Sequence, residues 1–157
     1  MTNGQYVFDH ILKSKEEGGL GYKNSDVFIF GRSIGTGPAC HLASKYNPRG
    51  LILVSPYTSI KHVAANIAGK FLSLFMAHHF NNIGVIKKVN CPIIMIHGRK
   101  DDLILSTHSE NLMKEFLESK QEGDPCLDES RLLIHPHMTH NHFDMDVDII
   151  MPVGDFI

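Results

Sequence analysis

The chain has 157 residues, with 15 Lys and Arg against 17 Asp and Glu, and a formal net charge of −2 at pH 7. This length can bury the core of one ordinary domain, and we predict a single domain over residues 1–157. The two charge signs nearly cancel and form no long run, which gives no electrostatic support to a nucleic-acid partner and favours a small or acyl ligand.

Apolar runs and helical spacings alternate along the chain and predict an α/β fold. Helices are expected near residues 6–11, 33–46, 60–80, 106–120 and 143–151, and strands at 27–30, 51–54, 92–96 and 131–135. The run at 27–30 is wholly apolar, as expected of a parallel strand covered on both faces. The polar residues 121–129 predict a surface loop. The alternation predicts a parallel sheet of about four strands flanked by helices.

The cysteines and the N-terminal segment predict a cytosolic protein. Cys40, Cys91 and Cys126 are widely spaced and form no CxxC pair, which is typical of a reducing compartment. Residues 1–17 mix charged and apolar side chains and lack the apolar core of a signal peptide. The apolar stretch 71–77 is far shorter than the roughly 20 residues that span a bilayer. We expect it to cover the core, with peripheral membrane contact as the alternative.

A GxSxG motif, Gly31-Arg32-Ser33-Ile34-Gly35, stands between the first predicted strand and the next helix. This context predicts a nucleophile elbow, a tight turn that exposes the Ser33 hydroxyl. We expect both glycines to allow close packing, and the Ile34 N–H and the helix N-terminus to stabilise an oxyanion. The alternative is a glycine-rich turn with an inert serine; the motif lacks the lysine of a phosphate-binding loop.

An acid and a histidine should lie downstream, because a serine hydroxyl is a weak nucleophile until a base takes its proton. The third strand is followed by His97-Gly98-Arg99-Lys100-Asp101-Asp102, in a loop of the kind that holds active sites. A single loop aspartate can also cap a turn or helix. Four histidines follow the last strand, where the third member is expected: His135, His137, His140 and His142.

Two patterns in the sequence are similar to metal sites, but each lacks a required residue. The spacing HxHxxH over residues 135–140 is similar to a metallo-hydrolase motif, but Thr139 stands where its aspartate belongs and no further ligand motif follows. Three alternate aspartates at 144–148 suggest a calcium loop. Ile149 occupies its glycine position and the downstream glutamate is missing. We therefore expect no metal.

Three segments together resemble the α/β-hydrolase superfamily, and within it the α/β-hydrolase-domain proteins of the protein-depalmitoylase (acyl-protein thioesterase) branch. They are Phe30-Gly-Arg-Ser-Ile-Gly-Thr-Gly-Pro, Leu53-Val-Ser-Pro-Tyr-Thr-Ser and Ile96-His-Gly-Arg-Lys-Asp, and the match covers most of the chain. The Ser-Pro-Tyr-Thr-Ser element is more diagnostic than GxSxG, because the general hydrolase motif does not require it.

This resemblance implies hydrolysis of acyl esters or thioesters without a cofactor, with an acyl ester or an acylated protein as the substrate. The family's HGxxD pattern selects Asp101 as the orienting acid. Its Gly-His-Asn stretch selects His140 as the general base, with a threonine in place of the glycine and His142 as the alternative. Ser33 is then the nucleophile, and the Ile34 N–H is an oxyanion donor.

The earlier part of the family's fold is not found in this sequence. No strands precede the nucleophile strand, and a His-Gly-Asn loop and an N-terminal cysteine cluster are missing. We therefore expect an N-terminally truncated domain whose exposed sheet edge favours self-association and weak activity. The alternative function is a catalytically impaired fragment or pseudoenzyme that acts as a binding or interaction module.

Overall fold

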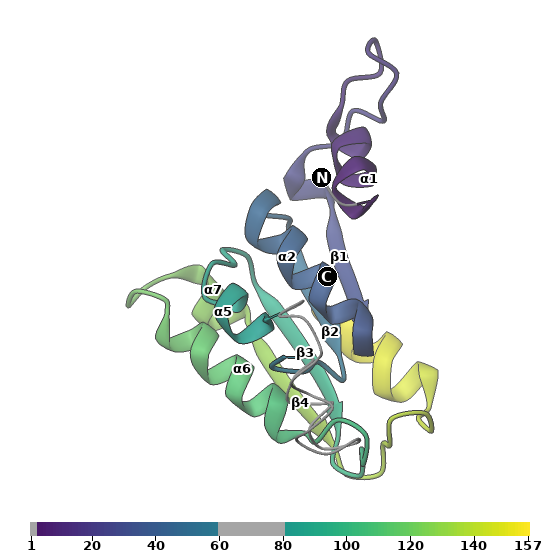
Figure 1. Cartoon of the computed structure of the whole chain (residues 1–157), viewed down its shortest axis with the longest axis vertical. Helices are drawn as coiled ribbons and strands as arrows, with labels where there is room; N and C mark the ends of the chain where they lie inside the picture. Colours follow the sequence, from purple (N-terminus) through teal and green to yellow (C-terminus); the bar gives the residue numbers. More distant parts are fainter. Residues whose placement is uncertain (1–2, 60–80) are drawn as a thin grey trace, which may run out of the picture.

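A computed structural model describes residues 3–59 and 81–157, so the helix expected at 60–80, with its apolar stretch, lies outside the described residues. Within these ranges the strands form one parallel sheet in the order β1-β2-β3-β4 (Figure 1). The strands are β1 (Phe28–Arg32), β2 (Gly50–Val54), β3 (Ile93–Gly98) and β4 (Arg131–His135). The predicted fold class is confirmed.

Helices cover the two faces of this sheet unequally. One face carries α1 (Asn3–Leu12), α2 (Thr36–Tyr46), α5 (Asn82–Ile86), α6 (Thr107–Glu118) and α7 (Pro125–Glu129). The other carries the π-helical segment η3 (Met145–Ile150) and α8 (Met151–Gly154). Short 3-10 turns, η1 (Asn24–Asp26) and η2 (Ser33–Gly35), flank β1. None of the helices in these ranges is long and apolar enough to cross a membrane.

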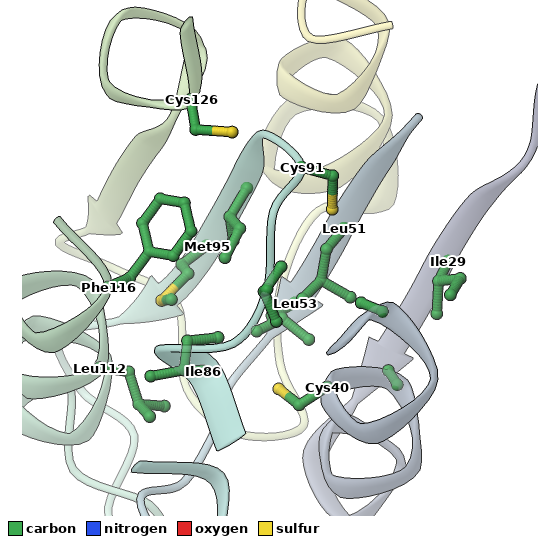
Figure 2. Packing of buried hydrophobic residues seen from close by; sticks show 14 of the residues in the cluster. Ile29, Cys40, Leu51, Leu53, Ile86, Cys91, Met95, Leu112, Phe116 and Cys126 are labelled. Atoms are coloured by element: carbon green, nitrogen blue, oxygen red, sulfur yellow. The ribbon is translucent and has the colours of Figure 1, made fainter. Parts of the chain in front are cut away.

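The larger hydrophobic core lies between the sheet and α2, α5 and α6. Alternate strand residues point to this side because successive side chains of a strand face opposite ways. Figure 2 shows Leu51, Leu53 and Met95 meeting Ile86 and Phe116 from the helices, and all five are fully buried. The intervening strand residues form the smaller core under η3 and α8: Ile52, Val54, Ile94 and Ile96.

The expectation that the first strand is covered on both faces is wrong. Ile29 is buried against the helices, but Phe30 on the opposite face is 55% exposed. The reason is that the smaller core under η3 and α8 takes its buried strand residues from β2 and β3, while β1 joins it through the partly buried Phe28, whose ring meets that of Phe156 after α8. In the described part of the chain, β1 pairs with β2 alone and forms one edge of the sheet.

The polar segment 121–129 is not only a loop, because it contains the helix α7. The start of α7 has an N-terminal capping pattern, which the polar composition of the segment did not reveal. Asp124 Oδ1 accepts a hydrogen bond of 2.9 Å from the Cys126 N–H, and Pro125 occupies the first helical turn. Burial of Cys126 against the core then holds this short helix in place.

The last helix is also displaced from its expected position. It begins with η3 at Met145 and ends with α8 at Gly154, whereas residues 143–151 were expected. Asp144 sets this start because its side chain accepts hydrogen bonds from the N–H groups of Asp146 and Val147. His142 therefore lies before the helix, in the preceding loop.

The three free thiols are predicted to be unreactive in the folded protein. Burial raises the pKa of Cys40 and Cys91 to about 12 and that of Cys126 to about 11, and the thiolate is the reactive form. Iodoacetamide at mildly alkaline pH should leave all three unmodified in the native protein and alkylate all three in urea, as counted by mass spectrometry. Rapid alkylation of native Cys40 would contradict the packing in Figure 2.

Candidate active site

The chain turns sharply where β1 meets the following helix. Ser33 has a φ of 51°, in the left-handed region that residues other than glycine seldom occupy. The carbonyl of Ser33 accepts hydrogen bonds from the N–H and the Oγ1 of Thr36, the latter at 2.7 Å. These bonds tighten residues 33–35 into η2, so the single helix expected at 33–46 is divided into η2 and α2.

The two glycines of the motif have different roles. A Cβ at Gly31 would lie 2.6 Å from the Ala39 Cβ and 2.7 Å from the Gly35 carbonyl oxygen, so β1 and α2 approach too closely for a side chain. A Cβ at Gly35 would meet nothing within 4 Å, and its φ is −67°. The expected need for close packing is confirmed at Gly31 and is wrong at Gly35.

The structure brings together the three predicted catalytic side chains from the ends of β1, β3 and β4. Ser33 Oγ lies 3.0 Å from His140 Nε2, and His140 Nδ1 lies 2.8 Å from Asp101 Oδ2. Asp101 is 2% exposed and His140 is 6% exposed. The competing residues stay outside this arrangement: Asp102 is exposed, and the exposed His142 has its Nδ1 3.5 Å from Thr139 Oγ1.

The Asp101 carboxylate stays ionised although it is buried. Burial alone would raise its pKa, but hydrogen bonds involving His97, the Ile104 N–H and His140 outweigh burial and hold the pKa well below its usual range. An ionised carboxylate only accepts, so His140 Nδ1 must carry the proton and Nε2 is free to take the Ser33 proton. The lowered pKa stabilises the fold above about pH 4, and this stabilisation is lost as the pH falls toward the folded-state value.

Residues 99–106 form the loop after β3 that carries Asp101, called the acid loop here. This loop and the end of β3 hold the carboxylate in place. The N–H groups of Leu103 and Ile104 donate to Asp101 Oδ1 at 3.1 and 2.8 Å. His97, fully buried, has Nε2 3.4 Å from Asp101 Oδ2 and 2.7 Å from the Ile104 carbonyl oxygen. Its Nδ1 lies 2.5 Å from Ser109 Oγ. Sequence reasoning missed this supporting role, although a histidine that ends an apolar strand was a usable signal.

Hydrogen bonds between backbone groups join the acid loop to the histidine loop, which is residues 136–144 between β4 and η3. The N–H of Arg99 donates to the His135 carbonyl at 2.8 Å, and the N–H of Lys100 to the Met138 carbonyl at 3.2 Å. A Cβ at Gly98 would lie 2.1 Å from the Met138 oxygen, so only glycine permits this approach. The distance from Asp101 to the histidine is therefore fixed by main-chain contacts.

Thr139 suits the position where the family has glycine. Its N–H donates to the His142 carbonyl at 3.0 Å, and its Oγ1 accepts from the His142 N–H at 3.0 Å. Its φ is not positive, so the turn before His140 does not need glycine.

Two further side chains that sequence reasoning missed hold the elbow. Tyr57, from the segment after β2, donates its hydroxyl to the Ile34 carbonyl at 3.4 Å, and burial raises the pKa of Tyr57 to about 12, so this donor keeps its proton. The Arg32 side chain donates to the His140 carbonyl and lies over the Phe143 ring. Ile34 itself follows Ser33 in η2, which places its N–H in the first turn beside the serine; its oxyanion role stays a prediction.

The histidine and aspartate clusters have other partners in this structure. His135 Nδ1 lies 3.2 Å from Asp148 Oδ1, His137 is exposed, and His140 faces the serine. Asp144 caps η3. Within residues 3–59 and 81–157, no group of three or more His, Cys, Asp or Glu side chains is arranged to hold a metal ion.

Sequence comparison finds similarity to proteins that include α/β-hydrolase domain-containing proteins. No family model matches. The chain is 38% identical over 88 residues to alpha/beta hydrolase domain-containing protein 17B of Homo sapiens, covering 56% of this chain and 30% of that protein. It is 32% identical over 118 residues to an uncharacterized protein of Mycobacterium tuberculosis, covering 69% and 42%. The chain thus spans less than half the length of these curated relatives.

Solved structures share the fold at low sequence identity. Acetyl xylan esterase 1 from Thermoanaerobacterium sp. gives a TM-score of 0.65 at 12% identity, covering 95% of this chain and 49% of that one. Acylaminoacyl peptidase from Pyrococcus horikoshii gives a TM-score of 0.61 at 13% identity, covering 89% and 23%. At such identities the likeness establishes the fold alone.

Substitution of the two motif glycines should have opposite effects. Gly31→Ala forces its Cβ against Ala39 and should destabilise the protein by about 1–3 kcal/mol. Gly35→Ala enters open space at a negative φ and should be neutral, or stabilise by up to about 1 kcal/mol. Urea unfolding followed by circular dichroism measures both. Equal losses of stability in the two variants would contradict the packing at the elbow.

Proposed function

We propose that this chain, which has an α/β-hydrolase fold and sequence similarity to an α/β-hydrolase domain-containing protein, is a serine hydrolase that cleaves acyl esters or thioesters. The observation that carries the proposal is the continuous contact from Ser33 Oγ through His140 to Asp101, at 3.0 and 2.8 Å. A buried carboxylate, an imidazole in one tautomer and a serine at a strained turn form the set of groups that acyl transfer needs.

The first half of the reaction forms an acyl-enzyme. Ser33 Oγ attacks the carbonyl carbon of the ester or thioester while His140 Nε2 takes the hydroxyl proton, and the ionised Asp101 stabilises the imidazolium. The carbonyl oxygen becomes an oxyanion, and in this proposal the N–H of Ile34, the residue after Ser33 in η2, donates a hydrogen bond to it. When the tetrahedral intermediate collapses, the alcohol or thiol leaves with the proton from His140.

The second half regenerates the enzyme. His140 Nε2 takes a proton from water as the water oxygen attacks the acyl-enzyme carbon, and the second tetrahedral intermediate collapses by releasing Ser33 Oγ, which takes back the proton. The products are a carboxylic acid and a free serine. A surface cavity of about 280 Å³ lies beside His140 between the acid and histidine loops and gives room for part of a substrate; its other lining residues are Lys100, Asp102, Thr139, Asn141 and His142.

Protein S-depalmitoylation is the more specific form of this proposal. It is supported by the resemblance of the Ser-Pro-Tyr-Thr-Ser and HGxxD segments to the depalmitoylase branch. The second candidate function is an interaction module without turnover, favoured by the exposed Phe30 on the open face of β1. A cytosolic protein that contacts membranes peripherally would suit either function.

A fluorophosphonate probe tests the nucleophile and separates these candidates. We expect stoichiometric labelling of Ser33 and complete loss in Ser33→Ala, because the probe needs an activated serine oxygen. Ser55→Ala is the matched control: Ser55 directly follows the neighbouring strand β2, with a φ of 48° and a buried Oγ that lacks a partner among the described residues. No labelling of the native protein would favour the interaction module, and labelling at another residue would reject Ser33 as the nucleophile.

Hydrolysis of a short acyl thioester tests the base. His140→Ala should lower kcat/KM by on the order of 10³-fold or more, and combining it with Ser33→Ala should add almost nothing, since the three groups act as a unit. His142→Ala should lower kcat/KM far less than His140→Ala, because the exposed His142 ring lines the cavity beside His140 but lies outside the contact with Ser33. A larger loss for His142→Ala than for His140→Ala would reverse the assignment.

A further inference from the structure

Arg32 connects the elbow to the loop that carries the histidine. Its Nη2 donates to the His140 carbonyl oxygen and lies 3.5 Å from Asn141 Oδ1. The guanidinium carbon lies 5.2 Å from the centre of the Phe143 ring, a cation–π distance. One side chain therefore contacts three residues of the segment between β4 and η3.

These contacts affect the distance between Ser33 Oγ and His140 Nε2, across which the proton would move. Residues 136–144 have no regular helix or strand. The loop after β3 holds this segment at Met138 and His140, and Arg32 adds a contact from the end of β1. Arg32 is bonded to Ser33 through the backbone and to His140 through its guanidinium, so a single residue relates the nucleophile to its base. A misplacement of about 1 Å at such a contact can cost on the order of 10²-fold in rate.

We infer that Arg32 is a positioning residue that ties the histidine loop to the end of β1 and thereby sets the contact of His140 with Ser33. The importance of that contact for catalysis rests on the proposed function. The tie between the two segments does not, because it is a property of the fold that exchange measurements report without any substrate.

The hydrogen bonds of Arg32 allow an experiment to distinguish a role in positioning His140 from a role in the stability of the protein. Its Nε is buried and has no partner among the described residues, and a buried N–H without a partner is unfavourable. Methionine has a similar length and no such group. Arg32→Met should therefore fold with an unchanged thermal midpoint while it loses the tie to the loop. A residue that served stability alone would lower the midpoint when replaced.

Hydrogen exchange on the full chain tests the tie. In Arg32→Met, the amides of Thr139 and His142, which are bonded within the loop turn, should exchange at least about 10-fold faster, while amides of α6 keep their native rates. The matched control is Arg49→Met, because Arg49 also lies over an aromatic ring, 5.9 Å from the centre of Phe28 at the opposite end of β1 from Arg32. This control should leave loop exchange unchanged.

Kinetics and chemical rescue test what the tie does. With a short acyl thioester, Arg32→Met and Arg32→Ala should lower kcat by roughly 10- to 100-fold with little change in KM. Arg32→Lys should recover part of the loss, because an ammonium group can still donate to the His140 carbonyl. Guanidinium chloride below denaturing concentrations should restore activity to Arg32→Ala, whereas sodium chloride and urea should not.

The outcomes separate this inference from the proposed function. If the native chain is not labelled by the fluorophosphonate, the proposed function fails and loop exchange alone decides the tie. If the native chain is labelled, the inference is overturned by unchanged loop exchange in Arg32→Met, by native kcat in that variant, or by a lowered thermal midpoint with no rescue by guanidinium. Faster loop exchange, lower kcat and guanidinium-specific rescue together support it.

Discussion

The candidate site depends on one buried negative charge. A carboxylate that is almost fully removed from water is unfavourable unless hydrogen bonds replace its hydration. Asp101 obtains these from the Leu103 and Ile104 N–H groups and from His140, with His97 close to the same oxygen. These bonds shape the loop after β3, fix the tautomer of the histidine and leave its other nitrogen facing the serine. The charge thus organises the groups around it.

The parallel sheet supplies the geometry that makes this organisation possible. Because all its strands are parallel, the turns after β1, β3 and β4 leave the sheet at the same end, the C-terminal end of the strands, which is the lower end in Figure 1. At this end of the sheet, two glycines allow backbone segments to approach each other closely. Gly31 brings α2 against β1, and Gly98 brings the acid loop against the histidine loop. Side chains from distant parts of the sequence meet because their backbones are already in contact.

Two features at this end of the sheet are unfavourable for stability. Ser33 is held in a left-handed conformation, and Arg32 has a buried Nε without a partner among the described residues. Each is unfavourable by itself, and both lie within the same short motif. The surrounding packing, which includes the fully buried strands β2 and β3, supplies the stability that allows the site to keep such conformations. Ser55, which follows β2, has a φ of 48° and a buried Oγ without a partner among the described residues, so the same kind of strain recurs after the neighbouring strand.

The sequence by itself determined the four strands, the nucleophile candidate Ser33 and the loops that carry its candidate partners, because those signals are local. The apolar runs at 51–54 and 131–135 needed only strand alternation to be recognised, and Ser33 needed only its motif and the strand before it. Tertiary structure decided which of the four histidines meets Ser33, since residues so close in sequence differ only in where the folded loop directs each ring. It also decided the exposure of Phe30 and the contacts of Arg32 and His97. Those depend on which surfaces meet across the fold, a non-local outcome that neither residue type nor spacing encodes.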